Sequence, residues 1–116
     1  MAMRFHDRHE WIDYLKACEM ARRLVADPSM VADAQRFVAT RMLPDPHQRD
    51  YARMWQALLA RPPAEIAAAL TEDSPHGRLL RETRPVFGKG LTSRDVADLI
   101  ARAEALPMEH ADAPAL

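Results

Sequence analysis

The chain has 116 residues, 48% of them hydrophobic, with 16 basic against 17 acidic side chains, a formal net charge of −1 and one cysteine. This length predicts one globular domain that builds its own core without a metal or a disulfide. The single Cys18 excludes an intrachain disulfide and four-cysteine zinc sites. The balanced charge argues against a protein that coats nucleic acid. We expect a cytoplasmic protein with no membrane partner, since no apolar run reaches the roughly 20 residues that span a bilayer and the N-terminus has no apolar signal core.

Composition also predicts the fold class. Alanine and arginine are abundant, whereas the strand-favouring residues Val, Ile and Thr are scarce. We therefore expect an all-α protein, a compact bundle of five to six short helices. The chain has only three glycines and no glycine-rich phosphate loop, and we expect no cofactor.

The first three helices can be placed from apolar spacing and from prolines that follow capping residues. The first should cover residues 7–25. The second should begin after Asp27, where Pro28 suits the first helical position, and end before Pro44. The third should begin after Asp45, and its apolar residues fall on one face at spacings of three and four.

The second half divides in the same way. A fourth helix should follow Pro62-Pro63, and a fifth should cover residues 75–83 after the cap Ser74. A glycine- and proline-containing loop, RPVFGKG, comes next, and a last helix should begin at the capping box Thr92-Ser93-Arg94-Asp95. We expect residues 1–106 to form a single helical domain and residues 107–116 to form a flexible, disordered tail.

Three patterns contain residue types that occur in catalytic or metal sites. His6, His9 and Asp13 lie near one another on the first helix, but their spacing departs from known zinc motifs, so we expect no metal. Cys18 lies on an apolar helix face, as buried structural cysteines do. The carboxylate pairs fall at helix ends, where they serve as caps. We therefore expect no catalytic residues and a protein that is not an enzyme.

The strongest local charge asymmetry lies between residues 78 and 94, where five basic side chains stand against Glu82 alone. Such a segment can hold nucleic-acid phosphates or the acidic surface of a protein. The alternative is a set of solvated arginines that also pair with the acid-rich C-terminal tail of the same chain, and the sequence leaves both open. On the first interpretation, the partner-binding residues are Arg78, Arg81, Arg84, Phe87, Lys89 and Arg94.

Residues 24–100 carry a pattern similar to that of small helical bacterial antitoxins encoded beside toxin genes. In this pattern a tryptophan and a Leu-Leu pair are followed by a short helix that starts at a proline and by an Asp-Ser helix that ends in Leu-Arg. A proline and a phenylalanine then precede a glycine and a leucine, and the last helix contains an arginine. The matching residues are Trp55, Leu58, Leu59, Pro63, Ile66, Leu70, Asp73, Ser74, Leu80, Arg81, Pro85, Phe87, Gly88, Leu91 and Arg94.

The resemblance implies a non-catalytic protein that binds and neutralises a cognate toxin, the product of an adjacent gene. Nucleic acid is a secondary partner, and a homodimer is left open. The alternative function is a helix-turn-helix DNA-binding regulator built from the fifth and last helices, although their connection is longer than the usual three or four residues.

Overall fold

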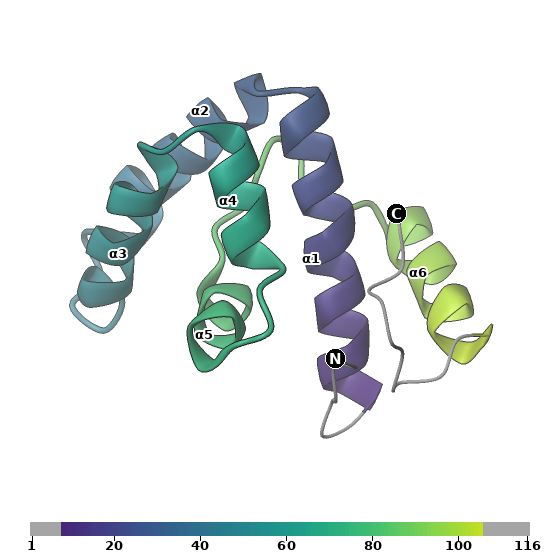
Figure 1. Cartoon of the computed structure of the whole chain (residues 1–116). Helices are drawn as coiled ribbons and strands as arrows, with labels where there is room; N and C mark the ends of the chain where they lie inside the picture. The colour runs from purple at the N-terminus through teal and green to yellow at the C-terminus, as the bar shows by residue number, and fades with distance from the viewer. Residues whose placement is uncertain (1–7, 106–116) are drawn as a thin grey trace.

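The computed structural model describes residues 8–105, which form an all-helical bundle without strands (Figure 1). The expected tail 107–116 lies outside the described residues. The elements are α1 (Arg8–Ala26), α2 (Ser29–Phe37), the π-helical turn η1 (Val38–Met42), α3 (Arg49–Leu59), α4 (Pro63–Leu70), α5 (Pro75–Thr83) and α6 (Ser93–Ala105). Between residues 8 and 105, no helix is both long and apolar enough to cross a membrane.

Helix α1 lies at the centre of the arrangement. Helices α4 and α5 lie on one side of it and α6 on the other, while α2, η1 and α3 form a hairpin beyond α4 (Figure 1). Its most extensive helix–helix contacts are with α4 and then α6. The first helix of the chain is therefore covered mainly by helices from the second half of the chain.

The core has two parts on either side of α1. The larger surrounds Trp55, which is fully buried, meets Phe87 edge to face and donates its indole N–H to Thr83 Oγ1 at 3.0 Å. The smaller joins α1 to α6 and is built from Trp11, Tyr14, Leu15, Leu99 and Ala103. Aromatic side chains thus anchor both parts of the core.

The predicted caps of α5 and α6 are confirmed. Ser74 Oγ accepts a hydrogen bond from the Gly77 amide at 2.9 Å. Thr92 and Asp95 bond reciprocally, since the Thr92 amide donates to Asp95 Oδ2 at 2.9 Å and the Asp95 amide donates to Thr92 Oγ1 at 3.1 Å. These local side-chain bonds satisfy amides that a helix start leaves unpaired.

The second helical segment ends before Pro44 as predicted, but its last turn, η1, is π-helical, because the Leu43 amide donates to the Val38 carbonyl, five residues back, at 2.8 Å. One boundary differs from the sequence prediction. Helix α3 begins at Arg49 because Asp45 closes a separate turn, its carboxylate accepting from the His47 amide and from the Gln48 side chain. The predicted capping residue therefore caps a turn that precedes the helix.

Candidate functional site

The arginine-rich segment joins α5 to α1. Arg78 pairs with Glu10 and Arg84 pairs with Asp13, each at 2.9 Å. Glu10 and Asp13 lie three residues apart on α1 and so face the same side of that helix. Arg78 and Arg84 are therefore held by acids of α1 and not by the tail acids that the alternative interpretation of the charge asymmetry expected.

Arg81 is buried, with 6% of its surface exposed. Its Nη1 donates to the carbonyls of Leu70 at 3.1 Å and Glu72 at 2.9 Å, where α4 ends, and its guanidinium lies over the Tyr14 ring, 5.2 Å from the centroid. Burial lowers the pKa of Arg81. The side chain caps α4 from inside the protein and does not reach the surface that a partner would meet.

The prediction that the loop displays Phe87 is wrong. Phe87 is 0% exposed, because its ring packs against Trp55 in the larger core. The neighbouring Val86 is the exposed apolar residue of the loop, at 44%. The loop is thus anchored by Phe87 and presents Val86.

Lys89 and Arg94 are the two predicted contact residues that the structure leaves exposed and without an ion pair among residues 8–105. Lys89 lies in a tight turn between Gly88 and Gly90, both with positive φ, closed by a hydrogen bond from the Gly90 amide to the Phe87 carbonyl at 2.9 Å. The six predicted residues therefore do not form one surface.

Two open hollows adjoin the loop, and Val86 lines both. One, of about 390 Å³, lies against α2 and η1 and is also lined by Arg36, Phe37, Arg41 and Lys89. The other, of about 280 Å³, lies against α1 and α6, where Lys16, Met20, Leu91 and Val96 contribute to its lining. We use the name loop face for five residues that line these hollows, four cations and the valine: Lys16, Arg36, Arg41, Val86 and Lys89.

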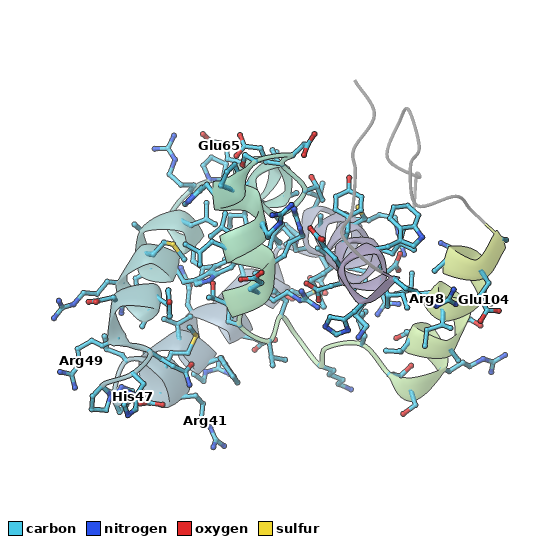
Figure 2. All side chains as sticks on the ribbon, turned by 90° about the horizontal axis from the view of Figure 1, so that it is seen from below. Arg8, Arg41, His47, Arg49, Glu65 and Glu104 are labelled. Atoms are coloured by element: carbon cyan, nitrogen blue, oxygen red, sulfur yellow. The ribbon has the colours of Figure 1, made fainter. Side chains whose placement is uncertain are left out.

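Sequence reasoning missed four members of the loop face: Lys16, Arg36, Arg41 and Val86. The signal for Val86 was present, because consecutive residues of an extended segment point to opposite sides, so a buried Phe87 implies an outward Val86. The three cations come from elements far from the loop in the sequence. Figure 2 shows Arg41 at the outer end of the hairpin, pointing away from the bundle.

Two of the candidate catalytic or metal-binding groups, Cys18 and Asp13, have partners inside the bundle. Burial raises the pKa of the Cys18 thiol, which interacts with the Tyr14 hydroxyl. The pKa of Tyr14 is also raised, chiefly by burial. Asp13 pairs with Arg84, and no three His, Cys, Asp or Glu side chains within residues 8–105 are grouped for a metal, while His6 lies outside that range.

A charged network closes the gap between α1 and α6. Glu19 accepts from both Arg22 and Arg23, and Arg23 also pairs with Asp95 at 3.1 Å. Hydrogen bonds from Arg23 and then Thr92 lower the pKa of Asp95 to about 2, and bonding to Arg22 lowers the pKa of Glu19. Beside the network lies a hollow of about 420 Å³, which Asp98 and Arg102 also line, and the Arg23–Asp95 pair joins α1 to α6.

Helices α5 and α6 do not form a helix-turn-helix unit. They lie on opposite sides of α1, and α6 packs against α1 (Figure 1). A recognition helix supported by its partner helix, the geometry of that motif, is therefore missing from this pair. No protein-family model, curated protein or solved structure matches the chain.

Proposed function

We propose that the chain is a non-catalytic protein-binding module, an antitoxin that binds and neutralises a toxin encoded by an adjacent gene. The observation that carries the proposal is the loop face, where an exposed Val86 lies between two hollows with cations around them. Apolar side chains ringed by charge are the usual anatomy of a protein interface. The antitoxin-like sequence pattern that includes Trp55 and Phe87 favours a toxin as the protein partner.

Protein is favoured over nucleic acid for three reasons. Arg78, Arg81 and Arg84 are held by internal acids and carbonyls, so the segment with the greatest positive charge does not offer a row of free phosphate contacts. The helix pair expected to enter a DNA groove is separated by α1. An apolar residue such as Val86 contributes more to a protein interface than to a phosphate backbone.

The test is neutralisation inside the host. The gene beside the one for this chain is expressed from an inducible promoter, with and without this protein, and growth is followed. We expect growth arrest that the protein relieves, together with a stoichiometric complex on size-exclusion chromatography. Arrest that the folded protein does not relieve, or a neighbouring product that does not bind, contradicts the proposal. Co-purification of DNA with a steep salt dependence would support the regulator instead.

A further inference from the structure

We infer that the loop face takes an acidic segment of the partner that also carries an apolar side chain, seated beside Val86. This inference rests on the proposed function and adds the chemistry of the bound segment. It commits to a protein segment with carboxylates as the occupant of the surface.

The charges around the two hollows indicate that the bound segment is acidic. The residues lining the two hollows include Lys16, Arg36, Arg41, Arg84 and Lys89 but one acid, Asp33. Arg36 pairs with Asp33 at 3.3 Å and Arg84 pairs with Asp13.

Lys16, Arg41 and Lys89 have no carboxylate partner among residues 8–105. The surface around Val86 is therefore positive, although the chain as a whole carries −1. Such a field attracts carboxylates and speeds their encounter with the surface.

The position of Val86 indicates that the bound segment also carries an apolar side chain. Apolar side chains line part of the hollow on the α1 side, beside Lys16 and Arg84. They are Met20, Val86, Leu91 and Val96. A purely acidic ligand would leave this apolar surface in water, whereas a segment with an apolar side chain would cover it. The bound segment therefore needs both kinds of side chain.

The loop that carries Val86 is held in one conformation in the free protein. Phe87 is buried in the core, the turn from Phe87 to Gly90 is closed by a hydrogen bond, and a Cβ at Gly88 would lie 3.2 Å from the Met30 side chain. Val86 is thus held in place before a partner arrives. Binding to a preformed surface avoids most of the ordering cost that a flexible loop incurs.

The experiment measures binding of the purified product of the neighbouring gene to variants of the full chain by biolayer interferometry. Val86→Ala should weaken binding about tenfold, mainly through faster dissociation, as loss of a central apolar contact does. Arg41→Glu and Lys89→Glu should each slow association about tenfold at low salt, and the difference should shrink at about 0.5 M salt.

Two matched controls lie away from the loop face. Val25→Ala removes the same side chain from another exposed position, at 49%, and Arg102→Glu reverses an exposed arginine on α6. Both should bind within about twofold of the wild-type protein, because neither position lines the two hollows. Circular dichroism melts of every variant confirm that it is folded.

The possible outcomes distinguish failure of the inference from failure of the proposed function. Weak binding by the Val86, Arg41 and Lys89 variants, with normal binding by both controls, supports the inference. Equal binding by all variants overturns the loop face and leaves the antitoxin function standing. A neighbouring product that does not bind the wild-type chain overturns both. Loss of duplex-DNA binding in the same variants would assign the face to nucleic acid and overturn the inference.

Discussion

Replacing Gly77 by alanine sets two effects of opposite sign against each other. Alanine is favoured over glycine in a helix by about 1 kcal/mol, so propensity alone predicts a more stable protein. Gly77 has no positive φ, and alanine fits its backbone conformation. The outcome therefore depends on the space around the new Cβ.

That space is already occupied. An ideal Cβ at position 77 would lie 2.2 Å from the Glu72 carbonyl oxygen and 3.2 Å from Arg81 Nη1. The carbonyl would have to move by roughly 1 Å, and it accepts hydrogen bonds from Arg81 at 2.9 Å and from the Ser74 amide at 3.1 Å. Overpacking and weakening of a charged hydrogen bond cost about 3–4 kcal/mol together. After the gain in propensity, Gly77→Ala should destabilise the protein by about 2–3 kcal/mol.

Urea denaturation followed by circular dichroism measures the effect. With an m-value of about 1.5 kcal/mol/M, the unfolding midpoint should fall by about 1.3–2 M. Ala68→Gly, at an exposed position of α4, is the control for propensity alone and should cost about 1 kcal/mol. A Gly77→Ala protein as stable as the wild type, or more so, would show that the Glu72 carbonyl is free to move and would refute the reasoning.

Three further predictions concern the rest of the bundle. Trp55→Phe should lower the free energy of unfolding by about 2 kcal/mol, because it leaves a cavity and removes the hydrogen bond to Thr83; an unchanged urea midpoint would contradict this. Asp95→Asn should destabilise the protein at pH 7. Because the pKa of Asp95 falls from 3.8 to about 2 on folding, its contribution is present above about pH 4 and is lost as the pH falls through 2. In urea titrations, the difference in unfolding free energy between Asp95→Asn and the wild type should therefore become smaller as the pH is lowered from about 4 to about 2. Amide hydrogen exchange should be faster in α6 than in α4, because α6 packs mainly on α1 through the smaller core; equal protection would contradict the division of the core.

Helix positions were predictable because their signals are local. Ser74-Pro75 and the capping box from Thr92 to Asp95 each act within four residues, and the structure has α5 and α6 where these pairs predict them. The start of α3 was misplaced because Asp45 can cap either a helix or a turn, and the conformation of residues 46–48 decides between the two. The π-helical turn at η1 has no comparable local signal.

The site was harder to predict because burial is decided by distant partners. Nothing near Arg81 in the sequence shows that the end of α4, eleven residues earlier, will receive its guanidinium. Likewise, either Val86 or Phe87 had to face inward, and the position of Trp55 decides which. Charge counting located a basic segment, but the acids of α1 that pair with it lie more than sixty residues away in the chain.

The central position of α1 has a consequence for synthesis of the chain. Residues 27–62 separate α1 from its main partner α4, and at about 5–20 residues per second the ribosome needs about 2–7 s to make them. During that interval the apolar stripe of Trp11, Tyr14 and Leu15 has no α4 or α6 to cover it. The hairpin of α2, η1 and α3 makes most of its helix–helix contacts within itself, and these can form meanwhile. The helix that is synthesised first is thus fully covered only after α6 has been made. Until then the nascent chain exposes the rings of Trp11 and Tyr14.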